Sequence, residues 1–105
     1  MEEREHIIIL YDYYGSLFTD IQKRYFEAYY FDNLSLSEIA LNEGKSRNAI
    51  HKSIKRVIME LYKYEEILKL YEREEKLKDI IKRVNDLEIK KELEGLLWMK
   101  DYRLI

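Results

Sequence analysis

The chain has very few of the residues that interrupt an α-helix. Its 105 residues include no proline and only three glycines. Proline and glycine mark most turns, so their scarcity argues against turn-rich β architectures, disordered linkers and collagen-like repeats. Between the glycines, apolar residues recur at helical spacing, and no strand-like alternation of useful length is present. The sequence therefore predicts an all-α protein of one domain, or of one domain with an appendage.

Local signals predict a helix-turn-helix in the N-terminal half. An apolar stripe predicts a helix over residues 2–14. Residues 19–22 and 35–38 each match a capping box, the pattern that begins a helix. The second of these helices is short and is expected to end at Gly44, and Ser46 caps another helix at once. Two helices joined by so short a turn cross steeply, as in a helix-turn-helix.

A second apolar stripe, with unbroken heptad spacing, follows Ser46. Its steps of four and three residues predict one long helix that ends at about Tyr71. We expect a helix-turn-helix domain over residues 1–62 and a C-terminal helical extension over residues 63–105. The far part of the stripe is predicted either to pair with a second copy, giving a homodimer, or to pack within the chain. The candidate dimerisation residues are Leu61, Tyr64, Leu68 and Tyr71.

The formal net charge of −2 conceals a segregation of charge along the chain. The balance is −6 over residues 1–44, +5 over residues 45–56 and −1 over residues 57–105. Five cations without an acid, at the start of the long helix, are the electrostatic pattern expected of a nucleic-acid binder. A solvated helix face is the other reading of such a block when it is taken alone.

The polar face of the helix after Ser46 carries the residues predicted to contact DNA. The first residues of such a helix reach base edges in the major groove, where Arg47 can pair with guanine and Asn48 with adenine. The lysines farther along are better placed for phosphates, which give affinity without sequence information. The predicted DNA-binding residues are Ser46, Arg47, Asn48, His51, Lys52, Lys55 and Arg56.

The sequence gives little support for a catalytic, metal-binding or membrane-spanning protein. The chain has no cysteine and two isolated histidines, His6 and His51, which argues against disulfides and metal clusters. Its carboxylates alternate with lysines, and no GxSxG, HExxH or glycine-rich phosphate loop is present. No long apolar run and no signal peptide are visible. We expect a cytoplasmic protein without enzymatic activity, cofactor or membrane insertion.

Aromatic residues crowd residues 11–31. Such a cluster can form a core between two helices, with its hydroxyl groups reaching the surface. It can also form a stacking platform for single-stranded nucleic acid. The charges around the cluster are mainly acidic, which favours the core.

Residues 11–56 resemble the YlxM family of small helix-turn-helix proteins from Gram-positive bacteria and mollicutes. Their sequence is YDYYGSLFTDIQKRYFEAYYFDNLSLSEIALNEGKSRNAIHKSIKR. The pieces that carry the resemblance are the YG run, the SLSEIA of residues 35–40 and the SR and IKR of residues 46–56. The same segment is similar to the promoter-reading domain of bacterial sigma factors. The resemblance implies a sigma-factor-like helix-turn-helix, with a long recognition helix, that binds double-stranded DNA in a regulatory role.

The resemblance also implies a second class of function. Genes of the YlxM family tend to lie beside the gene for the GTPase of the signal recognition particle. The alternative is therefore an accessory factor that binds this particle or its GTPase through the basic helix. Three residues depart from the family pattern: Lys45 replaces an apolar residue, Asn48 a glutamine and Lys52 an aspartate. Asn48 keeps an amide that can read adenine, and Lys52 strengthens attraction to phosphates.

Overall fold

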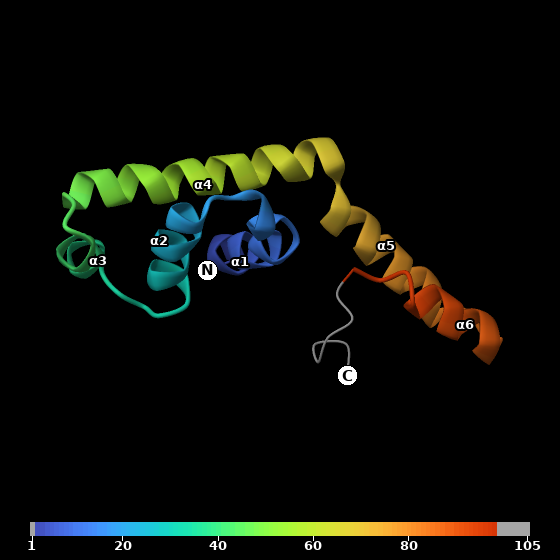
Figure 1. Ribbon diagram of the computed structural model, residues 1–105. Coiled ribbons are helices and arrows are strands. Elements are labelled where there is room, and N and C mark those ends of the chain that lie inside the picture. Colours follow the sequence, from blue (N-terminus) through green and yellow to red (C-terminus); the bar gives the residue numbers. More distant parts are fainter. Residues whose placement is uncertain (1, 99–105) are drawn as a thin grey trace. The chain divides into compact units, whose positions relative to one another are not determined.

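The computed structural model describes residues 2–98, which form six α-helices and no strand (Figure 1). The helices are α1 (Glu2–Tyr14), α2 (Asp20–Tyr30), α3 (Leu36–Glu43), α4 (Arg47–Leu68), α5 (Leu70–Lys82) and α6 (Leu87–Glu94), and a 3₁₀ turn, η1 (Gly15–Leu17), follows α1. The chain divides after Ile67 into two compact units, rather than after residue 62. We call them the first unit and the second unit. None of the described helices is both long and apolar enough to cross a bilayer.

Both predicted capping boxes are present. The Thr19 hydroxyl accepts a hydrogen bond from the Gln22 backbone N–H at 3.2 Å, and the Gln22 side chain accepts one from the Thr19 N–H at 2.9 Å. Ser35 and Glu38 make the same reciprocal pair at 3.1 and 2.8 Å. The hydrogen bonds from the Ser35 backbone and hydroxyl also hold the pKa of Glu38 below its ordinary value. Helices α2 and α3 therefore begin where the sequence predicts.

Gly15 ends α1 for a reason other than backbone freedom. It opens the 3₁₀ turn without a left-handed conformation, unlike the usual glycine after a helix. A Cβ at this position would lie 3.1–3.2 Å from the ring of Tyr11. The glycine therefore lets this aromatic side chain lie directly against the backbone.

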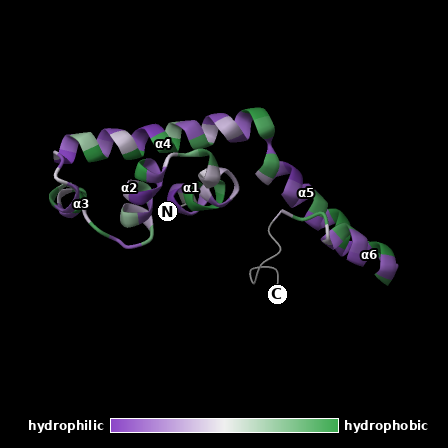
Figure 2. Cartoon of the chain, viewed as in Figure 1, coloured by the Kyte–Doolittle hydropathy of each residue, from purple (hydrophilic) through white to green (hydrophobic). Residues whose placement is uncertain are grey.

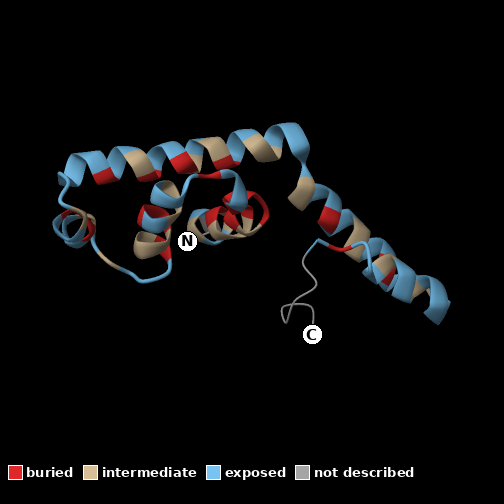
Figure 3. Cartoon of the chain, viewed as in Figure 1, coloured by how far each residue is buried: buried red, intermediate tan, exposed pale blue. Residues whose placement is uncertain are grey.

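The aromatic cluster forms the core of the first unit, with the buried sides of α1, α2 and α4 turned toward one another (Figure 3). Phe26 has no exposed surface, and its ring stacks on Tyr11 at 4.1 Å and on Tyr30 at 4.6 Å. The Tyr11 hydroxyl donates to Glu27 at 2.7 Å. Burial and then this hydrogen bond raise the pKa of Tyr11 well above its ordinary value. Arg4 fixes the far end of α2 by donating to the Tyr30 carbonyl at 2.8 Å.

Hydrophobic and hydrophilic residues alternate along α4 (Figure 2), and its apolar stripe packs into this core. Ile50, Ile54, Val57 and Leu61 are all buried. The helix ends at Leu68, because Lys69 has a left-handed backbone with φ of 55°. The prediction that the helix continues to Tyr71 is therefore wrong, and that residue lies on α5.

The second unit contains the antiparallel pair α5 and α6. Asp86 begins α6 by accepting hydrogen bonds from the backbone N–H groups of Glu88 and Ile89, at 2.9 and 3.1 Å. A short non-helical segment, residues 83–86, therefore separates α5 from α6. The last helix ends at Glu94, directly before Gly95.

Candidate nucleic-acid interface

A three-residue turn joins α3 to α4. Gly44 adopts the left-handed conformation, with φ of 66° and ψ of 35°. The backbone N–H groups of Gly44 and Lys45 both reach back to the Ala40 carbonyl, which satisfies the end of α3. The Ser46 hydroxyl then accepts a hydrogen bond from the Ala49 N–H at 3.0 Å and so begins α4. The predicted helix-turn-helix is therefore present with its expected turn.

We expect Gly44→Ala to lower the free energy of unfolding by about 1–2 kcal/mol, because a residue with a Cβ is strained in the left-handed region. No atom lies within 4 Å of a Cβ built at Gly44, so packing should contribute little to the loss. Urea denaturation followed by circular dichroism measures the difference. Gly44→Asn should lower the free energy of unfolding by less than Gly44→Ala does, because asparagine tolerates this conformation better. Equal stability of Gly44→Ala and wild type would contradict this account of the turn.

A bidentate ion pair attaches α3 to α2 next to this turn. Arg24 donates from Nε and from one terminal nitrogen to the two carboxylate oxygens of Glu43, at 2.9 and 2.8 Å. The hydrogen bond lowers the pKa of Glu43 and raises the pKa of Arg24. Sequence reasoning missed this pair, because the two residues lie 19 positions apart with no shared pattern. The pair also compensates the acid that directly precedes Gly44.

The predicted DNA-binding residues lie together on the outer face of α4. All seven are exposed: Ser46, Arg47, Asn48, His51, Lys52, Lys55 and Arg56. The buried stripe through Ile50, Ile54 and Val57 occupies the opposite side of the same helix. Among the described residues, only Arg56 of this set forms an ion pair, with Glu60 at 3.1 Å. We call this exposed set the basic face.

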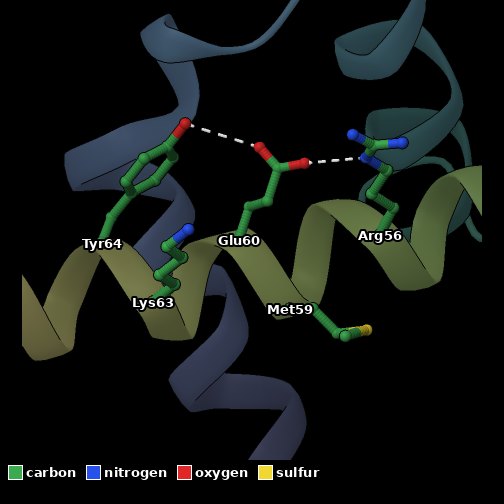
Figure 4. A pocket seen from close by; sticks show the side chains of 5 residues that line it. All are labelled: Arg56, Met59, Glu60, Lys63 and Tyr64. Carbon is green, nitrogen blue, oxygen red and sulfur yellow. Dashed lines mark hydrogen bonds and ion pairs between the residues drawn. The ribbon is translucent and has the colours of Figure 1, made fainter.

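Beyond Arg56 the outer side of α4 is mixed in character (Figure 4). Glu60 accepts from the Arg56 side chain and, at 3.5 Å, from the Tyr64 hydroxyl. These side chains line a hollow with Met59, which is 62% exposed, and Lys63. Sequence reasoning did not single out Lys63, although its spacing of seven from Arg56 puts both on one side of the helix.

A smaller hollow of about 190 Å³ lies on the other flank of α4. Aromatic and aliphatic side chains form its wall, and two residues of the basic face, His51 and Lys55, complete it. The lining residues are Tyr29, Tyr30, Leu36, His51, Ile54, Lys55 and Ile58. The hollow therefore brings α2 and α3 to the edge of the basic face, which the sequence did not show.

The residues predicted to form a dimer seam do not share one surface. Leu61 has no exposed area, and the Tyr64 ring lies 5.9 Å from those of Tyr14 and Phe18. These two residues of the seam pack inside the first unit. Leu68 is 46% exposed and, with Tyr71, belongs to the second unit.

The chemistry of the interface is that of charge and hydrogen-bond donors. The described residues contain no group of three histidine or acidic side chains arranged to hold a metal ion. The basic face offers two guanidinium groups, an amide and two ammonium groups, which suit base edges and phosphates.

Comparison with known proteins identifies a family and several individual proteins whose sequences are similar to this chain. Residues 1–98 match the UPF0122 family model, described as "Putative helix-turn-helix protein, YlxM / p13 like". A UPF0122 protein of Ureaplasma urealyticum is 39% identical over 94 residues, which cover 90% of this chain and 95% of that protein. One from Clostridium kluyveri is 42% identical and covers 97% of this chain and 96% of its own. One from Malacoplasma penetrans is 48% identical over 80 residues, which cover 76% of this chain and 75% of that protein.

Proposed function

This chain belongs to the UPF0122 family of YlxM-like helix-turn-helix proteins, and from that premise we propose that it binds double-stranded DNA in a regulatory, non-catalytic role. The observation that supports the proposal is the basic face on the outer side of α4. Lys52 and Lys55 are exposed there, and no ion pair within the described residues engages either of them. Such cations are available to phosphates.

The first turn of α4 is suited to the major groove. A helix with its side chains is about 10–12 Å wide and fits a groove of about 12 Å. Arg47 and Asn48 stand at the start of the helix, where residues reach base edges, and are the candidates for sequence discrimination. Lys52, Lys55 and Arg56 follow and are the candidates for phosphate contacts.

The rest of the chain limits DNA binding to this face. Residues 1–44 carry a charge of −6, which repels a duplex. We therefore expect weak non-specific binding and contacts confined to α4. The same acidic body, together with exposed Met59 beside the cations, favours a second candidate function. In it, the basic face binds a protein or RNA surface of the signal recognition particle or its GTPase.

The double variant Lys52→Ala/Lys55→Ala tests the DNA proposal. We expect its affinity for a duplex to fall at least about tenfold at about 50 mM salt, because two phosphate contacts are lost. Fluorescence anisotropy with a labelled duplex measures this change. The control is Lys82→Ala/Lys91→Ala, which removes the same charge from exposed positions of the second unit.

The control variant should bind as wild type does. Equal affinity of the Lys52/Lys55 variant and wild type would reject the basic face as the DNA-binding surface. A change in GTP hydrolysis by the particle's GTPase on adding this protein, without DNA, would support the second candidate instead.

A further inference from the structure

The two acids nearest to the cations of residues 45–56 are both engaged by arginines. That segment contains five cations and no acid, and Glu43 and Glu60 are the acids that flank it. Glu60 pairs with Arg56, a residue of the basic face, at 3.1 Å (Figure 4). Glu43 instead pairs with Arg24, which lies on α2 outside the segment. One flanking acid therefore engages a cation of the basic face, and the other does not.

Without Arg24, Glu43 would have two other cations within reach. Lys45 and Arg47 follow it by two and four residues, are exposed, and belong to no ion pair within the described residues. The chain from Glu43 to Arg47 spans at most about 14 Å, a distance that two long side chains can bridge. Arg24 lowers the pKa of Glu43 most, and the charge of Lys45 lowers it further, so this lysine already acts on the carboxylate.

Arg24 is well placed to keep Glu43 from these cations. Its guanidinium donates to both carboxylate oxygens of Glu43, at 2.9 and 2.8 Å, a two-point contact that a lysine ammonium does not match. The guanidinium also lies 5.9 Å from the centre of the Tyr25 ring. Tyr25 and Phe26, the next two residues of α2, are buried in the core, so the backbone that carries Arg24 is fixed. The core of the first unit therefore determines where the Glu43 carboxylate is held.

We propose that Arg24 is a positioning residue of the DNA interface, which holds Glu43 so that Lys45 and Arg47 stay available to the duplex. The inference rests on the DNA-binding function proposed above. An uncompensated Glu43 pairs with one of these cations, which weakens the attraction of α4 to DNA. The contribution is electrostatic rather than structural. The side chains of Arg24 and Glu43 are 55% and 21% exposed, and an ion pair at the surface adds little to stability.

Three variants, measured by fluorescence anisotropy with a labelled duplex, test the proposal. Arg24→Ala should lower the affinity at least about threefold at about 50 mM salt, because one cation is withdrawn from the interface. Glu43→Ala should bind at least as tightly as wild type, because no acid then competes for the cations. Arg24→Ala/Glu43→Ala should bind within about twofold of wild type, because the acid that Arg24 holds is also gone. Circular dichroism should show the same helix content in all three.

Lys23→Ala is the matched control, because it removes the same charge from the adjacent residue of α2. Its affinity should stay within about twofold of wild type. If Arg24 contacted a phosphate itself, or if its link between α2 and α3 were needed, the double variant would bind as weakly as Arg24→Ala. That result would overturn the proposal, as would wild-type affinity of Arg24→Ala or an equal loss in Lys23→Ala.

The exchange of partners is also measurable without DNA. In the Arg24→Ala chain, Lys45 and Arg47 should become the partners of Glu43. Replacing both of them by alanine should therefore raise the pKa of the Glu43 carboxyl more in that chain than in wild type. NMR titration of the side-chain carboxyl carbons measures both rises. Equal rises would show that neither cation takes the place of Arg24, and would overturn the proposal.

The Lys52→Ala/Lys55→Ala variant, measured in the same anisotropy assay, separates this proposal from the DNA-binding function. If that variant binds the duplex as wild type does, the DNA-binding function of the basic face fails, and the role of Arg24 fails with it. If that variant loses affinity and Arg24→Ala does not, only the role of Arg24 fails.

Discussion

Leu61→Ala is expected to lower the free energy of unfolding of the first unit by about 2–5 kcal/mol. Leu61 has no exposed surface and packs in the same buried row as Val57. Truncating it removes buried apolar area and leaves a cavity among side chains that relax only in part. Urea denaturation followed by circular dichroism measures the loss.

Met59→Ala is the matched control, since Met59 lies two residues earlier on the same helix and is 62% exposed. It should change the free energy of unfolding by no more than about 0.5 kcal/mol. The decisive contrary result would be a Leu61→Ala chain that unfolds like wild type but sediments as a monomer where wild type is a dimer. That result would show that Leu61 contributes to a dimer interface and not to the core of the first unit.

The Leu61 prediction shows what the apolar heptad spacing of α4 can and cannot indicate. The heptad spacing from Ile50 correctly indicated that one side of α4 is buried. It did not indicate what covers that side, because a core and a dimer interface require the same apolar spacing. The aromatic rings of Tyr14 and Phe18, from a segment almost 50 residues earlier, occupy the place of a second helix.

Structural features that depend on residues close together in the sequence were predicted correctly. The capping boxes at Thr19 and Ser35 and the left-handed Gly44 depend on contacts within a few residues, which the sequence displays directly. The end of α4 was not predictable in this way. Lysine has no preference for the left-handed conformation that Lys69 adopts, so no residue type marks this break. The Arg24–Glu43 pair was equally hidden, because only the packing of α3 on α2 brings the two together.

Much of the basic face could be predicted, because the buried stripe of α4 fixes which residues point outward. Asn48, Lys52 and Arg56 are spaced by four, so a helix with Ile50 and Ile54 buried must expose them. The hollow beside His51 could not be predicted. It forms only because Tyr29 and Leu36, on two other helices, reach the same flank of α4.

Binding to a duplex is expected to weaken by roughly 40-fold when monovalent salt rises from about 50 to about 200 mM. The basic face supplies about three phosphate contacts, and each contributes about −0.9 to the slope of log K against log salt. Lys52, Lys55 and Arg56 are the cations counted, because Arg47 is assigned to base edges. Anisotropy titrations at several salt concentrations give the slope directly.

Two neighbouring substitutions separate charge from base recognition in the same measurement. Lys55→Ala should make the slope less steep by about 0.9 and weaken binding on all sequences alike. Asn48→Ala should leave the slope unchanged, because its amide carries no charge, and should reduce only the preference for particular base pairs. A slope near zero for wild type would show that phosphates do not hold the duplex. The basic face would then bind a partner that it recognises by shape and apolar contact. The exposed Met59 is the side chain available for that contact.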